Sequence, residues 1–471
     1  MTSDAAEAAV AAMRAAGVPD VAVRVFAAYH DQLRQHVTGT IPEASVTPLT
    51  DVPRLDDEPV GDEEVRAALD ATVVLKLNGG LGTSMGVPGP KSALEVRDGR
   101  TFLDVVAEQV LALRARHGTR TPLLLMNSFR TRDASLEILG RHADLAVDGL
   151  PLDFLQHKEP KLRADTLAPV RWPEDPELEW CPPGHGDVYV ALWASGLLDR
   201  LHDLGYRHLF LSNADNLGAT CDGAIPAWMA ARDVPYLAEV CRRTVNDRKG
   251  GHLVVRRSDG RLVLRDNAMV EPGEEEAFQD VGRHPYFHTN NLWVDVEALL
   301  RRLEESDGVL GLPIIVNRKT VDPTRPDSTP VIQVESAMGA AIELFEGARA
   351  VEVDRSRFRP VKTTNELLLV RSDLYRITDE GVVESTTERP EPFVDLAEPY
   401  RLLAGFEERF PRGVPSLRLC SSLRVEGDTT FGGGVVCVGD VRVAAGTTTV
   451  PDGAVLDGAG PADDGLTGGR A

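Results

Sequence analysis

The chain has 471 residues, and 42% of them are hydrophobic, which is enough for two or three domains with buried cores. Its 51 lysines and arginines stand against 73 aspartates and glutamates, a formal net charge of −22. Because so acidic a surface repels phosphate polyanions and anionic lipids, we expect neither nucleic acid nor a membrane surface as a partner. A phosphate ligand would need local cations, backbone amides or a metal ion at its site.

The five cysteines stand far apart and form neither a C-x-x-C pair nor a cysteine–histidine spacing that could chelate zinc. We therefore expect reduced thiols in a cytoplasmic protein. The first residues, MTSDAAEAAVAAMRAAGV, carry acidic side chains where a secretory signal would carry basic ones. No apolar stretch of the sequence approaches the ~20 residues of a membrane span.

The N-terminal segment is rich in alanine, and residues 4–36 have the composition of one or two amphipathic helices. A segment rich in proline and aspartate follows at 42–65 and is typical of a connection. We interpret residues 1–65 as an N-terminal helical extension.

From Thr72 onward, short β-rich runs alternate with helix-length segments. The runs TVVLKLN (72–78), PLLLMNS (122–128) and RHLFLSNAD (207–215) predict strands, and residues 102–116 and 188–205 predict helices. This alternation is typical of βαβ units and predicts an α/β fold with a mainly parallel sheet and helices on both faces. Its functional loops are expected at the carboxyl ends of the strands.

The second half of the chain is richer in β signals. Several runs between 236 and 293 could extend the sheet with antiparallel strands. Valine and glycine then recur at short intervals over 423–458, as in a small β-helix or β-roll. We therefore predict a central domain over 66–385, a C-terminal β-helix-like domain over 386–460, and a disordered tail over 461–471.

The loop after the first predicted strand, LNGGLGTSMGVPGPKS (77–92), is dense in glycine and ends near Lys91. Glycines let the backbone approach a ligand closely, and successive amides can cradle phosphate oxygens. The spacing G-x-G-x-x-x-G over 80–86 does not fit the dinucleotide fingerprint, and Pro90 interrupts a P-loop match before Lys91. Two interpretations stay open on the residues alone: a surface turn without ligand, or a loop that wraps a nucleoside triphosphate.

A family resemblance favours the second interpretation. The loop is similar to the signature loop of the eukaryotic-type UTP-glucose-1-phosphate uridylyltransferases, also called UDP-glucose pyrophosphorylases. Further segments agree in the same order over about residues 72–376, with the C-terminal β segment plausibly included. They are LLMNSF at 124, WCPPGHGDVY at 180, FLSNADNLGAT at 210, KGG at 249, FHTNNLW at 287, IIVNRKT at 314 and SRFRPVKTTNELLLV at 356.

The resemblance implies the fold and the reaction. It implies a Rossmann-like (GT-A-like) nucleotidyltransferase domain with a mixed, mainly parallel sheet, flanked by the helical extension and the β-helix-like domain. Members join UTP and glucose 1-phosphate to give UDP-glucose and pyrophosphate, by in-line attack of the sugar phosphate on the α-phosphorus with the help of Mg²⁺. Catalysis then consists mainly of positioning two anions and neutralising developing charge.

The resemblance also assigns residues of the glycine loop. Leu77, Asn78, Gly79 and Gly80 match positions along the nucleotide, with the two glycines close to the uracil ring. Lys91 matches a lysine that reaches the triphosphate, and we predict a catalytic role for it.

Three further positions match nucleotide and sugar-phosphate contacts. Gln156, in DFLQ, matches the glutamine that hydrogen-bonds uracil, although alone it would be read as a surface amide. In PPGHGD the prolines and glycines fix a tight turn that presents Gly184 and His185 near the nucleotide and the sugar phosphate.

The end of the strand RHLFLSNAD supplies Asn213 and Asp215 at a place where parallel sheets present ligand groups. A carboxylate there suits Mg²⁺, which keeps several waters and shares its other ligands with substrate phosphates. Asp215 is the predicted metal ligand, although an aspartate in such a turn is by itself more often a cap.

The last predicted contacts come from two later motifs. In FHTNNLW, Asn290 matches a contact to glucose hydroxyls, whereas His288 stands where the family commonly has asparagine. In PVKTT, Lys362 matches a lysine that reaches the phosphates during transfer, and it is the second predicted catalytic residue.

Alternatives from other classes stay open. Related enzymes act on other sugar 1-phosphates, but N-acetylhexosamine relatives usually carry arginine at the position of Ser84. A non-catalytic nucleotide-sugar sensor would be expected to lose Lys91, Asp215 or Lys362, and all three are present. An NAD-dependent dehydrogenase is disfavoured by the glycine spacing. Self-association through the C-terminal domain is left undecided.

Overall fold

The structure, a computed structural model, divides into two compact units. Unit 1 comprises Met1–Gly79, Val110–Ala214 and Ala219–Phe358, and unit 2 comprises Gly80–Gln109, Asp215–Gly218 and Arg359–Ala471. The structure describes residues 4–37, 39–57, 59–82, 85–87, 89–244, 247 and 250–458. The predicted tail (461–471), Ser84 and Lys249 lie outside the described residues.

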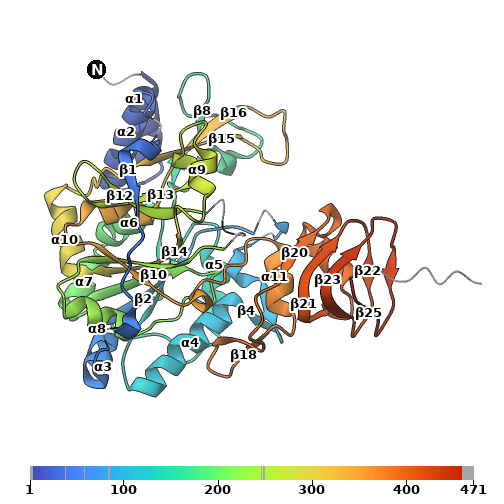
Figure 1. Cartoon of the computed structure of the whole chain (residues 1–471). Helices are drawn as coiled ribbons and strands as arrows, with labels where there is room; N and C mark the ends of the chain where they lie inside the picture. The colour runs from blue at the N-terminus through green and yellow to red at the C-terminus, as the bar shows by residue number, and fades with distance from the viewer. Residues whose placement is uncertain are drawn as a thin grey trace, which may run out of the picture. The chain divides into compact units, whose positions relative to one another are not determined.

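A seven-stranded sheet forms the centre of unit 1 (Figure 1). Strands β17–β11, β10–β2, β2–β5 and β5–β6 pair in parallel, whereas β14 is antiparallel to both β10 and β11. The predicted mixed, mainly parallel sheet is confirmed. In sheet order the strands are β17 (Arg349–Glu352), β11 (Tyr236–Arg242), β14 (Tyr286–Asp295), β10 (His208–Asn213), β2 (Thr72–Asn78), β5 (Leu123–Asn127) and β6 (Asp153–Leu155).

The central strand β2 is buried along its whole length, as expected for a parallel strand covered on both faces. Its one charged residue, Lys76, is 1% exposed. The Lys76 Nζ donates to Ser212 Oγ at 2.8 Å and to the Ala219 carbonyl at 2.7 Å, and it lies 5.4 Å from the centre of the Phe210 ring. These contacts satisfy a buried cation that would otherwise destabilise the strand.

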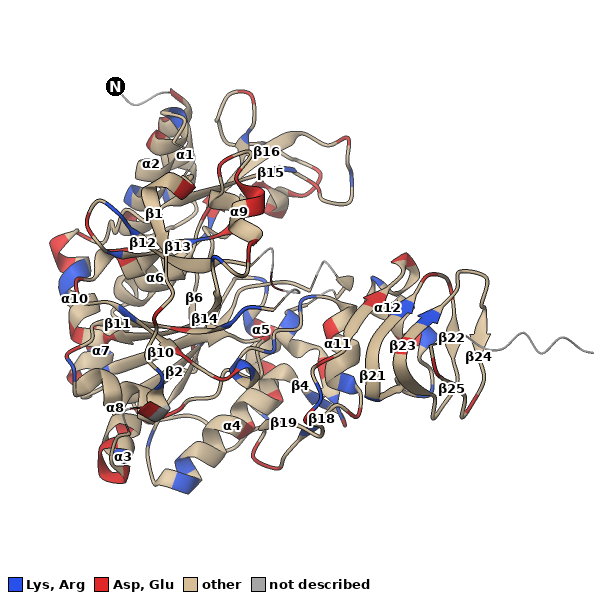
Figure 2. Cartoon of the chain, viewed as in Figure 1, with Lys and Arg blue, Asp and Glu red and all other residues tan. Residues whose placement is uncertain are grey.

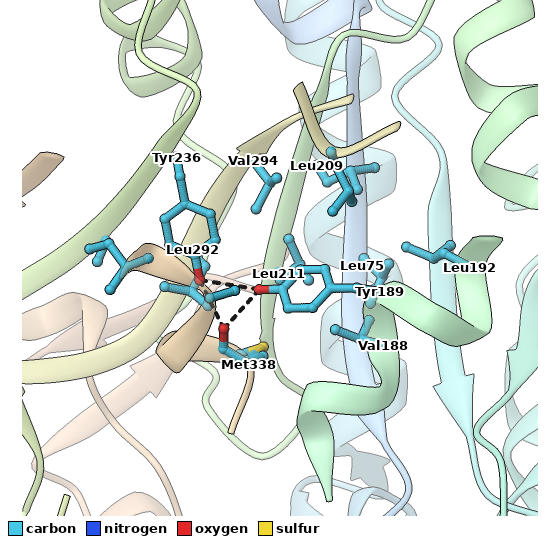
Figure 3. Close-up of a cluster of buried hydrophobic side chains, with 14 of the residues drawn as sticks. Leu75, Val188, Tyr189, Leu192, Leu209, Leu211, Tyr236, Leu292, Val294 and Met338 are labelled. Atoms are coloured by element: carbon cyan, nitrogen blue, oxygen red, sulfur yellow. Dashed lines mark hydrogen bonds between the residues drawn. The ribbon is translucent and has the colours of Figure 1, made fainter. Parts of the chain in front are cut away.

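Helices α6 (Val188–Ala194), α7 (Leu197–Asp203) and α10 (Val296–Glu305) share one hydrophobic core with the sheet. Figure 3 shows the part of this core in which Val188, Tyr189 and Leu192 of α6 meet residues of the sheet. The helical stretch predicted over 188–205 forms two helices, because the chain breaks at Gly196. This glycine adopts φ 69°, a left-handed conformation that ends α6 and starts α7.

Helices α1 (Asp4–Ala15) and α2 (Asp20–Arg34) confirm the helices expected at the N-terminus (Figure 1). Their apolar faces share a core with residues of a second sheet, including Ile314, Ile332 and Val334. That sheet is formed by β15 (Ile314–Thr320), β16 (Pro330–Ser336) and β8 (Leu162–Arg163).

The strands expected between 236 and 293 go to two sheets. The prediction is right for β11 and β14, which join the main sheet, and wrong for β12 (His252–Arg256) and β13 (Leu262–Arg265). β12 pairs with β13 on one side and with β1 (Val46–Pro48) on the other, and β1 lies inside the segment expected to be only a connection. The helix α3 (Asp62–Asp70) also begins there, with three acidic residues in its first turn (Figure 2).

Unit 2 contains the C-terminal strands, which all pair in parallel along the chain (Figure 1). This pairing of successive strands is the pattern of a β-helix, as the valine and glycine spacing predicts. Helices α11 (Thr364–Arg371) and α12 (Leu403–Arg409) lie in the same unit. The strands are β20 (Phe393–Leu396), β21 (Ser416–Val425), β23 (Val436–Val443), β25 (Val455–Leu456), and the pair β22 (Thr430–Phe431) and β24 (Thr449–Val450).

The helix α4 (Phe102–His117) confirms the helix predicted over 102–116. No helix in the described ranges is both long and apolar enough to cross a membrane. The remaining elements are β3 (Glu95–Arg97), β4 (Arg100–Thr101), α5 (Arg132–Leu139), β7 (Glu159–Pro160), β9 (Trp180–Cys181), α8 (Ala224–Ala230), α9 (Glu275–Gln279), β18 (Tyr375–Ile377) and β19 (Val383–Ser385).

Candidate active site

The carboxyl ends of β2 and β10 bring the first predicted residues together in unit 1. Leu77 and Asn213 are register partners, and the Ala214 N–H donates to the Leu77 carbonyl at 3.1 Å. The side-chain amide of Asn78 is 3% exposed and donates to Asn127 Oδ1 and Ser135 Oγ, each at 2.7 Å. The Asn78 amide therefore ties β2 to β5 and α5.

Gly79 packs directly against Gln156. A Cβ at position 79 would lie 2.5 Å from Gln156 Oε1, so any larger residue there would displace the Gln156 amide. The Gln156 backbone N–H donates to the Asn127 carbonyl at 2.8 Å, and its Nε2 donates to the Gly184 carbonyl at 2.7 Å. The structure therefore brings together Gly79, Gln156 and Gly184, which the sequence assigned separately to the nucleotide.

The PPGHGD turn is hydrogen-bonded to the end of β16. Gly184 has φ 81°, and a Cβ there would lie 2.6 Å from the Ser336 carbonyl oxygen, so both conformation and space require glycine. The Ser336 N–H donates to the Pro183 carbonyl at 3.0 Å. Two residues further on, the Met338 N–H donates to His185 Nδ1 at 3.0 Å.

This contact fixes the chemistry of His185. Burial lowers the pKa of His185 to about 4, against a smaller raising effect from Asp266, so the ring is neutral at pH 7. With Nδ1 accepting from Met338, the proton of the neutral ring sits on Nε2. His185 thus offers one N–H donor.

A buried ion pair beside these residues has no counterpart in the sequence predictions. His157 Nδ1 lies 2.8 Å from Asp187 Oδ1, and the His157 backbone N–H donates to Asp187 Oδ2 at 2.7 Å. Burial lowers the pKa of His157, but the charge and hydrogen bond of Asp187 outweigh it and leave the pKa raised. The pair joins the residue after Gln156 to the PPGHGD turn, and the nearness of both residues to predicted site positions was the only signal in the sequence.

Asn290, in β14, is hydrogen-bonded to Asn213 on the side of β10 away from β2. Its Nδ2 donates to Asn213 Oδ1 at 3.1 Å, and its backbone N–H donates to His288 Nδ1 at 3.2 Å. Asn290 adopts φ 61°, a left-handed conformation that is uncommon outside glycine. It occupies a bulge, because the pairing of β11 with β14 passes from Ala238–Leu292 to Val240–His288 and leaves Glu239 opposite three residues.

Glu239 holds this bulge and was also missed by the sequence analysis. It is fully buried, and its carbonyl accepts from Thr289 Oγ1 at 2.7 Å. Its carboxylate accepts from Asn291 Nδ2 at 3.0 Å, Trp293 Nε1 at 2.8 Å, and the Arg357 Nε and Nη2 at 2.7 and 2.5 Å. Burial raises the pKa of Glu239, but Arg357 and the hydrogen bonds leave it lowered. A glutamate within the apolar run YLAEV was the available signal.

The charged residues predicted for the site lie in unit 2. The Lys91 Nζ is 2.5 Å from Asp215 Oδ2, and the Lys91 N–H donates to the Gly80 carbonyl at 3.3 Å. The Val361 N–H donates to the Asp215 carbonyl at 3.2 Å, which places the segment of Lys362 beside Asp215. Lys362 is exposed and precedes Thr363, the N-cap of α11.

The structure thus sorts the predicted residues into two groups. The neutral hydrogen-bonding residues fall in unit 1 and the ionic residues in unit 2, with Gly80. The chain passes from one unit to the other at Gly79–Gly80 and at Ala214–Asp215. Unit 1 holds Leu77, Asn78, Gly79, Gln156, Gly184, His185, Asn213 and Asn290, and unit 2 holds Gly80, Lys91, Asp215 and Lys362.

A mainly parallel α/β sheet with a glycine-dense loop after β2 and amide side chains at its strand ends is typical of an α/β enzyme that binds nucleotides. The chain matches the family described as UTP–glucose-1-phosphate uridylyltransferase over residues 23–437, and it belongs to that family.

Relatives agree along nearly the whole chain. The UTP–glucose-1-phosphate uridylyltransferase of Solanum tuberosum is 42% identical over 418 residues, covering 87% of this chain and 84% of that protein. A UDP-glucose pyrophosphorylase mutant from Leishmania major, solved in complex with UDP-glucose, aligns with a TM-score of 0.91 and 41% identity over 98% of this chain and 99% of that one. A UDP-glucose phosphorylase from Trypanosoma brucei aligns with a TM-score of 0.91 and 43% identity over 97% of this chain and 99% of that one.

Proposed function

We propose that this protein transfers the uridylyl group of UTP to glucose 1-phosphate, giving UDP-glucose and pyrophosphate. The observation that carries the proposal is family membership over residues 23–437. Lys91, Asp215 and Lys362, the ionic residues that the reaction needs, are all present.

In this mechanism a phosphate oxygen of glucose 1-phosphate attacks the α-phosphorus of UTP, and the bond to the leaving pyrophosphate breaks in line. Gly79, Gly80 and Gln156 hold the uracil, and the His185 Nε2–H donates to the sugar phosphate. Lys91 binds the triphosphate in the ground state. Lys362 stabilises the charge that grows on the phosphates in the transition state.

Glucose selection is assigned to the asparagine pair. Asn213 and Asn290 are hydrogen-bonded to each other, and amide side chains supply both donors and acceptors for sugar hydroxyls. The left-handed backbone of Asn290 sets the direction of its amide. His288 supports that backbone through Nδ1, which gives this chain its own variant of the family motif.

The residues present fit a Mg²⁺ ion at Asp215. Oδ2 is paired with Lys91, whereas Oδ1 is buried and has no hydrogen-bond partner among the described residues. A hard cation that takes one carboxylate oxygen and completes its shell with water and substrate phosphates suits this free oxygen. When bound, Mg²⁺ would neutralise phosphate charge during transfer.

All five cysteines are free thiols, which supports a reducing compartment such as the cytoplasm. We also propose self-association through the C-terminal strands, which size-exclusion chromatography with light scattering tests.

The test is a matrix of nucleoside triphosphates and sugar 1-phosphates, incubated with purified protein and Mg²⁺, with pyrophosphate release as the readout. UTP with glucose 1-phosphate should give the highest kcat/KM. Another nucleotide or sugar ahead by tenfold or more would reject the specificity. A folded protein that binds UDP-glucose but releases no pyrophosphate from any pair would instead be a nucleotide-sugar sensor.

A further inference from the structure

Two buried tyrosines converge on one backbone carbonyl in the core of unit 1 (Figure 3). The hydroxyls of Tyr189 and Tyr236 lie 2.9 and 3.0 Å from the Met338 carbonyl oxygen and 3.1 Å from each other. Both side chains are fully buried. Because each hydroxyl has a single proton, at least one donates to the carbonyl, and the other donates there or to its neighbour.

These hydroxyls need an explanation, because the surrounding side chains are apolar. Leu75, Leu211 and Leu292 belong to the same cluster (Figure 3). Phenylalanine would fill nearly the same volume without burying a polar atom, and burying a hydroxyl costs free energy unless it is hydrogen-bonded. The shared partner of both hydroxyls, Met338, is therefore the place to look for their role.

Met338 is held on its other side by His185. Its carbonyl faces the tyrosines, and its N–H donates to His185 Nδ1 at 3.0 Å. Met338 is itself fully buried and begins the short helix Met338–Leu344. Because Met338 is hydrogen-bonded at both its carbonyl and its N–H, the two tyrosines and the His185 ring are linked through its backbone.

We propose that Tyr189 and Tyr236 are positioning residues for uridylyl transfer, which through Met338 hold His185 as its Nε2–H tautomer with that donor turned to substrate. This inference rests on the proposed function, because it takes His185 as a ligand of the sugar phosphate. A backbone N–H aimed at Nδ1 favours the neutral ring, since it stabilises the unprotonated nitrogen. Asp266 raises the pKa of His185, and His185 in turn lowers the pKa of His288, which burial brings to about 4.

The test compares the double variant Tyr189→Phe/Tyr236→Phe with wild type and with Tyr400→Phe. Tyr400 is a matched control, because it is also fully buried and donates to one backbone carbonyl, that of Thr429, in unit 2. The double variant should lose about 10- to 100-fold in kcat, the scale of a misplaced reacting group, with KM for UTP changed several-fold at most. Tyr400→Phe should keep wild-type kcat.

The pH profile of activity and the tautomer of His185 would not change if the two tyrosines only stabilised the fold. Without the tyrosines, Nδ1 becomes free to take up a proton, so the acid limb of kcat/KM should move upward in pH. ¹⁵N spectra of histidine-labelled protein, with the His185 signals assigned from a His185→Asn sample, should show the Nε2–H tautomer in wild type and its loss in the double variant. The single variants should show smaller effects, because the remaining hydroxyl can still donate to Met338.

The outcomes separate this inference from the proposed function. A folded double variant with the kcat, acid limb and tautomer of wild type overturns the inference while leaving the reaction intact. A wild-type protein that makes no pyrophosphate overturns the proposed function, and the ¹⁵N spectra still decide whether the tyrosines set the tautomer. If the double variant does not fold, Tyr236→Phe takes its place, and an unshifted acid limb there overturns the inference.

Discussion

Replacing Glu239 with glutamine should weaken both the fold and sugar binding. Each carboxylate oxygen accepts two hydrogen bonds: Oε1 from Arg357 and Trp293, and Oε2 from Arg357 and Asn291. In Glu239→Gln one oxygen becomes an NH₂ group, which faces two donors and can accept from neither. The variant therefore loses two of four hydrogen bonds to the carboxylate and leaves the Arg357 charge without its counterion.

The magnitude follows from burial. Glu239 is 0% exposed and the Arg357 side chain 13%, so solvent screens the pair little. Removing one partner of a buried pair costs about 3–5 kcal/mol of stability. The pair Arg325–Glu174 in the same unit is exposed, at 45% and 66%, and Glu174→Gln should cost about 1 kcal/mol or less. Denaturant unfolding of the two variants beside wild type measures this difference.

Activity gives a second measurement. Because Glu239 holds the bulge that carries Asn290, KM for glucose 1-phosphate should rise about tenfold in Glu239→Gln, while the Kd for UTP stays near wild type. The double variant Glu239→Leu/Arg357→Met replaces the pair with apolar side chains and should recover stability without recovering KM. A Glu239→Gln protein as stable as Glu174→Gln, with wild-type KM, would refute the reasoning.

The lowered pKa of Glu239 adds a pH signature. A carboxylate with a depressed folded pKa contributes stability that is present above the unfolded value of about 4.5 and is lost as pH falls through the folded pKa. The stability difference between wild type and Glu239→Gln should therefore be largest at neutral pH and shrink below pH 4.5. A difference that does not change with pH would show that the carboxylate is not ionised in the fold.

Three further outcomes are expected. Lys362→Ala should lower kcat by about 10²- to 10³-fold, while the calorimetric Kd for UTP changes several-fold at most. Lys91→Ala should weaken UTP binding as well. If Lys362→Ala kept a near-normal kcat and lost UTP binding, the two roles would be reversed. Asp215→Ala should remove most activity from a protein with a wild-type circular dichroism spectrum, and turnover with unchanged Mg²⁺ dependence would contradict its role as metal ligand. Because the pKa of His157 is raised, its pair with Asp187 stabilises the fold fully below pH 6.5 and loses that effect as pH rises through the folded pKa. Asp187→Asn should therefore cost more stability at pH 6 than at pH 9. Equal costs at both pH values would contradict an ionic pair.

The elements predicted well from the sequence are those with a local signal. The run TVVLKLN matches the bounds of β2, and in the PPGHGD turn Gly184 stands at a position that requires glycine. The same kind of signal was overlooked at Gly196, which splits the helix expected over 188–205. Local chemistry therefore places the motifs and most strand and helix starts.

The contacts that hold the site together have no local signal. Glu239 and Arg357 are 118 residues apart, and Tyr189 and Tyr236 reach Met338 across 149 and 102 residues. A single sequence shows such residues only as a charge or a hydroxyl within an apolar run. The pairing of β11 with β14 explains why Glu239 reaches Asn291 and Trp293, but Arg357 and Met338 lie outside both strands.

The proposed site residues of the two units differ in charge. Under the proposed function, unit 1 meets the neutral uracil and glucose with amide side chains, and its neutral His185 donates to the sugar phosphate. The phosphates carry the charge, and unit 2 supplies Lys91, Lys362 and Asp215. The Lys91 Nζ is paired with Asp215 Oδ2 at 2.5 Å, and this carboxylate competes with a substrate phosphate for the cation. Added salt should therefore weaken the contributions of Lys91 and Lys362 more than those of the amide side chains in unit 1.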